Sequence, residues 1–153
     1  MIEIVCDDRQ SDHVIAPEMY AKLLADALAV SGVRPPAEAG LAFVDSAEMT
    51  ELNVQHMGGD GPTDVLAFPI DGIAEAPADQ PAMVGDVVIC PAVAARAPQA
   101  LADELALLVV HGALHLVGHD HAEPGERLVM QRLEVELLAK FHRGGDADQV
   151  NRS

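Results

Sequence analysis

The sequence contains no tryptophan, one tyrosine and three phenylalanines, so aromatic side chains make up only 3% of its 153 residues. Half of the residues are nevertheless hydrophobic, which excludes a disordered composition and predicts an aliphatic core in a single domain. The longest apolar run, residues 105–110, is far too short to cross a bilayer. The N-terminus lacks the basic and apolar regions of a signal peptide. We therefore expect a cytoplasmic protein that does not bind membranes.

Basic residues are also scarce. Nine Lys and Arg stand against 25 Asp and Glu, which gives a formal net charge of −16. Such a charge argues against broad electrostatic attraction to nucleic acid or to anionic membranes, but it leaves a small local basic site possible. Five of the nine bases come late in the chain: Arg127, Arg132, Lys140, Arg143 and Arg152.

Cysteine occurs only twice, at Cys6 and Cys90. The two residues are far apart, and both lie in strand-like runs. We expect two buried, reduced thiols rather than a disulfide, as is usual in the cytosol.

The pattern of the chain predicts an α+β domain. Strand-like runs bounded by turn residues occupy 2–8, 40–46, 64–70 and 85–90. Helical patterns occupy 17–32, 47–57, 101–118 and 124–142, with Ser46 expected as the N-cap of the second. A short link between the third and fourth strands predicts a hairpin. The result is a small mixed four-stranded sheet with helices packed on it, spanning 1–143, followed by a flexible tail at 144–153.

Histidine is concentrated in one stretch, "HGALHLVGHDH", at residues 111–121. His111 and His115 lie four apart on a helix that is apolar almost all round, so both imidazoles face one side of a buried helix. Gly118 ends that helix, and His121 can return to the same point. Three imidazoles with one open position are typical of a catalytic zinc site, in which the pKa of bound water falls to about 7. We expect one zinc ion per chain.

Three neighbouring residues qualify this prediction. His119 lies close enough to compete as a third ligand, although the spacing favours His121. Asp120 is either an acceptor that orients a ligand imidazole or a turn-forming residue. Gly112 stands where zinc peptidases with an H-E-x-x-H motif carry their glutamate, so the general base of peptide hydrolysis is missing.

A second motif, "GPTDVLAFP" at 61–69, completes a resemblance. With "ELN" at 51–53, "GDVVIC" at 85–90 and the histidine stretch, the sequence resembles the YbeY family of bacterial endoribonucleases and rRNA maturation factors over residues 2–142. The resemblance implies zinc held by His111, His115 and His121. It also implies a cytoplasmic, single-strand-specific metallo-endoribonuclease without a nucleotide cofactor. The expected roles are 16S rRNA 3′-end maturation and late ribosome quality control with the small ribosomal subunit.

The sequence departs from the family pattern at three places. His56-Met57 replaces a frequent Tyr-Arg pair, so a basic group near the metal is missing, and Ala67 replaces a serine. His119 replaces a tyrosine. Another cation, Arg127 or Arg96, is expected to contact phosphate in place of the missing arginine.

No general base is evident from the sequence. Asp120 and His119 are candidates, and the substrate's 2′-OH is an alternative nucleophile. Two other functions stay open. One is a zinc-stabilised ribosome-assembly factor with little catalysis, which binds ribosomal proteins. The other is a metallopeptidase, which Gly112 disfavours.

Overall fold

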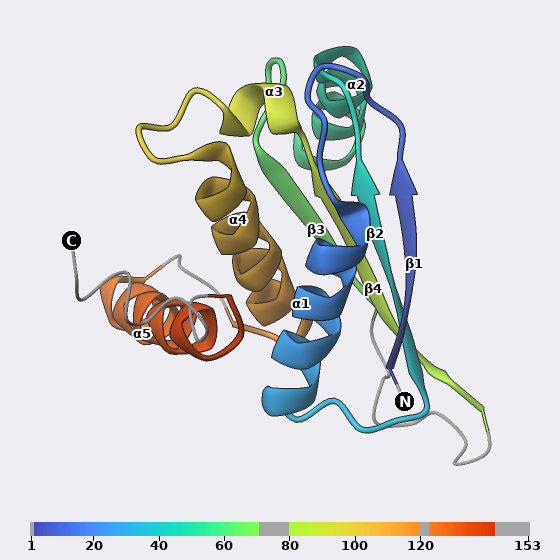
Figure 1. The fold of residues 1–153 in the computed structure, drawn as a ribbon, viewed down its shortest axis with the longest axis vertical. Helices are drawn as coiled ribbons and strands as arrows, with labels where there is room; N and C mark the ends of the chain where they lie inside the picture. The colour runs from blue at the N-terminus through green and yellow to red at the C-terminus, as the bar shows by residue number, and fades with distance from the viewer. Residues whose placement is uncertain (1, 71–79, 120–122, 143–153) are drawn as a thin grey trace.

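The computed structural model describes residues 2–70, 80–119 and 123–142 (Figure 1). Within these residues the strands are β1 (Ile2–Asp8), β2 (Ala37–Phe43), β3 (Val65–Pro69) and β4 (Ala82–Ile89). The helices are α1 (Pro17–Val30), α2 (Ser46–Met57), α3 (Pro91–Ala94), α4 (Leu101–Leu116) and α5 (Pro124–Phe141). The expected tail at 144–153 lies outside the described residues.

The four strands form one mixed sheet in the order β1-β2-β4-β3. β1 pairs with β2 and β2 with β4 in parallel, whereas β3 and β4 are antiparallel. The predicted fold class and hairpin are therefore confirmed. β4 begins three residues earlier than the sequence predicts, because Gly85 lies inside the strand instead of at its start. Gly85 has a φ of 140°, and a Cβ there would lie 2.4 Å from the carbonyl oxygen of Phe68. Only glycine fits this irregular point of the sheet.

Helices cover the two faces of the sheet unequally. α1 and α4 pack on one face, and α5 packs against α4 (Figure 1). The main core lies in this layer, and its largest fully buried side chains include Leu24, Leu28, Leu41, Phe43, Leu105 and Leu114. α4 is buried, as its apolar sequence predicts. No helix in the described ranges has both the length and the apolar character needed to cross a membrane.

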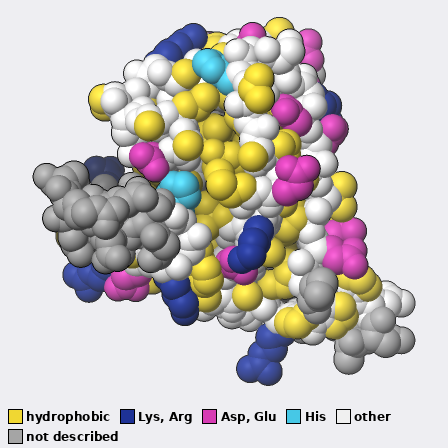
Figure 2. Space-filling model, in the orientation of Figure 1, with side chains coloured by type: hydrophobic (Ala, Val, Ile, Leu, Met, Phe, Trp, Pro, Cys, Tyr) yellow, Lys and Arg dark blue, Asp and Glu magenta, His cyan; other side chains and the backbone are white. Residues whose placement is uncertain are grey.

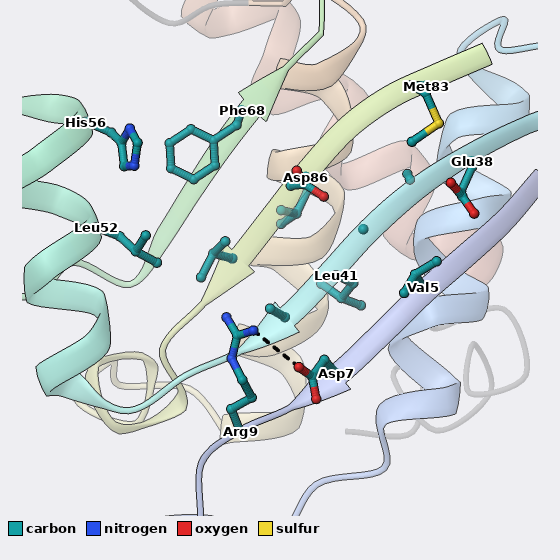
Figure 3. A pocket seen from close by; sticks show the side chains of 15 residues that line it. Val5, Asp7, Arg9, Glu38, Leu41, Leu52, His56, Phe68, Met83 and Asp86 are labelled. Carbon is teal, nitrogen blue, oxygen red and sulfur yellow. Dashed lines mark hydrogen bonds and ion pairs between the residues drawn. The ribbon is translucent and has the colours of Figure 1, made fainter. Parts of the chain in front are cut away.

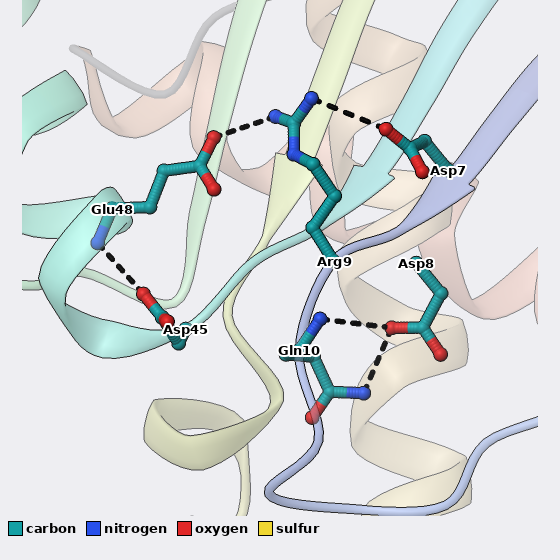
Figure 4. Close-up of polar contacts among 6 residues, drawn as sticks. All are labelled: Asp7, Asp8, Arg9, Gln10, Asp45 and Glu48. Atoms are coloured by element: carbon teal, nitrogen blue, oxygen red, sulfur yellow. Dashed lines mark hydrogen bonds and ion pairs between the residues drawn. The ribbon is translucent and has the colours of Figure 1, made fainter.

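α2 covers one end of the opposite face, where a smaller core includes Met49, Leu66 and Val88. The N-cap of α2 is Asp45, not Ser46 as expected from the sequence. A carboxylate oxygen of Asp45 accepts a hydrogen bond from the Glu48 N–H at 2.8 Å (Figure 4). Ser46 is already the first helical residue. Both residue types are favoured at an N-cap, and in this structure the extended backbone and the capping hydrogen bond belong to Asp45.

An ion-pair chain fastens α2 to the sheet. Arg9, just after β1, binds Asp7 at 3.2 Å and Glu48 of α2 at 2.7 Å (Figure 4). All three side chains are about one-third exposed or more, so these two ion pairs orient α2 more than they stabilise the fold.

The two cysteines are free thiols, as expected. Cys90 is fully buried, whereas Cys6 is only half-buried. Burial raises the pKa of the Cys6 thiol, and the carboxylates of Glu18, Asp8 and Asp7 raise it further. The thiol of Cys6 therefore stays protonated and weakly reactive at neutral pH.

Candidate metal centre

α4 presents His111 and His115 on one side, one turn apart. Their Nε2 atoms lie 3.2 Å from each other, and the ring planes meet edge to face. Two nitrogens that each bind a tetrahedral zinc at 2.0–2.1 Å are about 3.3 Å apart. The spacing of the two Nε2 atoms in this structure therefore fits two ligands of one zinc ion.

The acidic residue Glu134 of α5 orients His111. Its carboxylate accepts a hydrogen bond from His111 Nδ1 at 2.6 Å, and only 12% of the Glu134 side chain is exposed. A proton held on Nδ1 leaves the lone pair on Nε2, the atom that faces His115. Metal-binding histidines commonly have such a carboxylate partner, which fixes the ring and its tautomer.

Sequence reasoning missed Glu134. The carboxylate predicted to orient a ligand imidazole was Asp120, which lies outside the described residues. Glu134 is 23 residues from His111 and on a different helix. No local spacing rule connects the two, so only the packing of α5 on α4 reveals the contact.

The third expected ligand, His121, also lies outside the described residues. Within residues 2–70, 80–119 and 123–142, no three His, Cys, Asp or Glu side chains are arranged to hold a metal ion. The structure thus brings together two of the three predicted ligands.

His119 has a different setting. Its N–H donates to the Leu114 carbonyl oxygen at 2.9 Å, and Gly118 beside it has a φ of 101°. This is a common way for a helix to end. His119 lines a cavity of about 280 Å³ with Gly125, Glu126 and Val129, and neither His111 nor His115 lines it.

Two cavities flank the histidine pair. One, of about 270 Å³, lies towards β3 and is lined by Met57, Val65, Leu66, Ala67, His111, Gly112 and His115. The other, of about 180 Å³, lies towards α5 and is lined by His111, Arg127, Met130, Gln131 and Glu134. The cation proposed from the sequence, Arg127, thus shares a cavity with His111. Arg96, the alternative cation, lines neither cavity.

Gly112 allows α4 to approach the sheet closely. A Cβ on Gly112 would lie 2.7 Å from Cγ1 and 2.9 Å from Cγ2 of Val87, in the middle of β4. No side chain fits between the helix and the strand, so a glutamate could not occupy this position without moving α4. The absence of a general base here thus has a packing cause.

The "ELN" and "GPTDVLAFP" motifs shape the rim of the site. Asn53 Nδ2 donates to the Gly61 carbonyl oxygen at 2.9 Å and fastens the loop after α2. The Cys90 N–H donates to the Asp64 carbonyl oxygen at 2.9 Å, which starts the hairpin. The Thr63 hydroxyl lies 3.4 Å from the Asp64 carboxylate. These contacts are local, and the loop leads from Met57 to β3 beside the histidines.

A larger groove, of about 620 Å³, lies on the other face of the sheet (Figure 3). Its labelled side chains include Asp7, Glu38 and Asp86 from three strands, with Arg9 at one end. Neither His111 nor His115 lines it, so the groove is separate from the histidine pair. Acidic side chains also gather at the right of Figure 2, where Figure 1 places β1, in keeping with the net charge of −16.

The fold and the site define a class: small α+β proteins in which a buried helix carries an H-x-x-x-H pair beside an antiparallel hairpin. A family profile described as "Endoribonuclease YbeY" matches residues 5–142. The chain belongs to the YbeY family, as its motifs predict.

Curated relatives support this assignment. A protein of Salinispora tropica is 50% identical over 88% of this chain and 89% of its own length. Relatives from Mycolicibacterium smegmatis, at 46% identity over 77% of this chain and 69% of theirs, and from Thermobifida fusca, at 44% over 86% and 90%, are also similar. All three are named "Endoribonuclease YbeY", the activity class predicted here from the sequence. The names do not favour a peptidase or a non-catalytic factor.

A solved structure shares the fold. The solution structure of TM1509 from Thermotoga maritima matches with a TM-score of 0.55 over 94% of this chain and 93% of that one. The two sequences are 24% identical, so this likeness concerns the fold alone.

Proposed function

We propose that this protein is a single-strand-specific metallo-endoribonuclease that holds one zinc ion through His111, His115 and His121. Its proposed role is maturation of the 16S rRNA 3′ end and late ribosome quality control, in the cytoplasm with the small ribosomal subunit. Membership of the YbeY family supports the endoribonuclease class.

One observation carries the metal part of the proposal. The Nε2 atoms of His111 and His115 lie 3.2 Å apart, and Glu134 holds the opposite nitrogen of His111 at 2.6 Å. Such a pair supplies two neutral nitrogen ligands with fixed direction, the donor set that zinc prefers. A bound zinc ion would supply Lewis acidity for phosphoryl oxygens and a lowered pKa for water.

The other residues of the site have proposed roles that follow from their places. Glu134 keeps the proton on Nδ1 of His111, so that Nε2 faces the site. Arg127 binds a non-bridging phosphate oxygen from the α5 side, because its side chain borders the same cavity as His111. Arg127 would then contact phosphate in place of the arginine that the family often has where this chain has Met57. Asp120 and His119 are the proposed general bases, on sequence grounds alone.

The domain organisation is proposed to match the family profile, which ends at residue 142. We propose that residues 1–143 form the hydrolase domain and that 144–153 is a tail without a part in the chemistry.

The test combines metal analysis with RNA cleavage. The purified protein is expected to contain about one zinc per chain and to cut a 16S 3′-end precursor in its single-stranded part. A chelator should stop the cleavage and added zinc restore it. His115→Ala should lose both zinc and cleavage, while His13→Ala, which changes a histidine away from the site, should keep both.

The result that contradicts the proposal is also clear. If His115→Ala keeps the wild-type circular dichroism spectrum and cuts the precursor at the wild-type rate, the histidine pair is not the active site. The product ends report the nucleophile: a 2′,3′-cyclic phosphate indicates attack by the 2′-OH, and a simple phosphate indicates attack by water.

A further inference from the structure

The cavity on the β3 side of the histidine pair has a mostly apolar lining. Among the residues that the structure describes, its lining contains no Lys, Arg, Asp or Glu side chain. Met57, Val65 and Ala67 supply apolar walls, and His111 and His115 close one end. A zinc ion bound at the histidine end would attract a phosphate oxygen there. The apolar end formed by Met57, Val65 and Ala67 offers a phosphate no charged partner, but it suits a flat, uncharged ring.

Met57 gives this cavity an apolar surface against which a ring can pack. It is the last residue of α2, and its side chain is 51% exposed although it is apolar. The methionine thioether is polarisable and adapts its shape to aromatic rings. At 270 Å³ the cavity is smaller than the about 300–1,000 Å³ of drug-sized sites, so it accepts one ring system rather than a base pair.

The backbone of β3 supplies polar groups beside the same cavity. β3 is an edge strand of the sheet. The Cys90 N–H bonds to the Asp64 carbonyl and the Ile70 N–H bonds to the Val84 carbonyl, so the even-numbered residues pair with β4. In an antiparallel pair the alternate residues turn their N–H and C=O groups the other way. The peptide groups of Val65 and Ala67 therefore point to the outer edge, where they can donate to and accept from a ligand.

We propose, building on the ribonuclease function proposed above, that this cavity binds one unpaired nucleobase next to the scissile phosphate. The base stacks on Met57, and its edge forms hydrogen bonds with the peptide groups of Val65 or Ala67. A base within a duplex has its face stacked and its edge paired, so it cannot enter. The cavity thus selects single-stranded RNA by shape, with the phosphate lying towards Arg127.

The test measures how the base and Met57 depend on each other. Fluorescence anisotropy gives the Kd of a fluorescein-labelled single-stranded RNA, and of a series with one abasic ribose at successive positions. Met57→Ala is expected to weaken binding of intact RNA by about twofold to tenfold, the range for a methionine thioether packed against one ring. When the abasic ribose stands at one particular position, the wild type should bind the RNA more weakly by the same factor. Met57→Ala should bind that strand no more weakly than it binds intact RNA.

Two variants serve as controls. Val54→Ala removes another apolar side chain of α2 that is 52% exposed but does not line the cavity, and it should bind RNA as the wild type does. Ala67→Leu narrows the cavity and should reduce affinity for intact RNA while leaving the weak binding of the abasic strand unchanged.

The outcomes separate this inference from the function on which it rests. If the wild type cuts the RNA, but Met57→Ala binds every strand as the wild type does and no abasic position couples to it, the base site is wrong and the ribonuclease stands. If the wild type neither binds nor cuts any single strand, the ribonuclease proposal itself fails.

Discussion

At the scale of single residues, the site depends on contacts that join distant parts of the sequence. Spacing alone predicted that His111 and His115 face the same way, because four residues make about one helical turn. It could not predict Glu134, because the partner of His111 comes from α5. Nor could it explain Gly112, whose role depends on the distance between α4 and Val87.

Replacing Glu134 should weaken zinc binding. Without its carboxylate, His111 loses the group that fixes its tautomer, and loss of such a partner typically lowers metal affinity about 10–100-fold. Glu134→Ala should show this loss in a competitive zinc titration, whereas Glu134→Gln, which keeps an acceptor oxygen, should lose less. Glu136→Gln changes an exposed acid on the same helix and should leave affinity unchanged. Wild-type affinity in Glu134→Ala would refute the orienting role.

Gly112→Ala should destabilise the fold. The new Cβ would overlap both methyl groups of Val87, a fully buried residue of a central strand that has little room to move. Overpacking of this kind costs about 1–3 kcal/mol, while the better helix propensity of alanine returns about 1 kcal/mol. We expect a net loss of up to about 2 kcal/mol in the free energy of unfolding, measured in urea.

Two further variants check the cause of that loss. Adding Val87→Ala to Gly112→Ala should cost less than the sum of the two single changes, because the second change makes room for the first. Gly125→Ala, where nothing lies within 4 Å of the added Cβ, should be neutral or stabilising. Simple additivity at positions 112 and 87 would show that the overlap is relieved elsewhere.

At the scale of helices and strands, the sequence predicted each strand and each long helix of the described residues, and among these it missed only the short α3 as a separate element. Alternating and helical patterns determine type because they reflect which side is buried. Boundaries were less accurate. The Ala-rich start of β2 has weak strand propensity, yet pairing with β1 and β4 on both sides makes it extended from Ala37 onward. Such pairing is not visible along a single segment.

Asp45→Ala tests the corrected N-cap of α2. The Asp45 carboxylate is the acceptor for the Glu48 N–H, so its loss should lower the free energy of unfolding by about 1 kcal/mol. Ser46→Ala, one residue along, should have little effect on chemical denaturation. The reverse ranking of the two variants would mean that Ser46 caps the helix in solution.

At the scale of the whole molecule, the charge of −16 limits how RNA is held. Many phosphate contacts would require a basic surface, and the described face in Figure 2 has no continuous one. Binding should therefore rely on few phosphate contacts and on stacking. The composition leads to the same expectation, since it argues against a broad basic surface while leaving a local one open.

The salt dependence of RNA binding should be shallow. Each phosphate neutralised on a single strand contributes about −0.7 to the slope of log K against log salt concentration. If Arg127 binds one phosphate, Arg127→Gln should reduce the slope by about 0.7 units, measured by anisotropy at several salt concentrations. Arg132→Gln, an exposed arginine that does not line the site, should leave the slope unchanged. An equal effect of both variants would indicate a general charge effect only.

The way α5 is anchored has a consequence for the lifetime of the site. This helix supplies both Glu134 and Arg127, yet within its 18 residues only Met130, Leu137 and Leu138 are buried. Elements with few buried side chains open first in native-state fluctuations, at a smaller free energy than the core. Hydrogen exchange of the α5 amides should thus be faster than that of α4 and should slow when zinc binds. The site is then complete only while α5 is docked, and each opening of this helix interrupts it briefly.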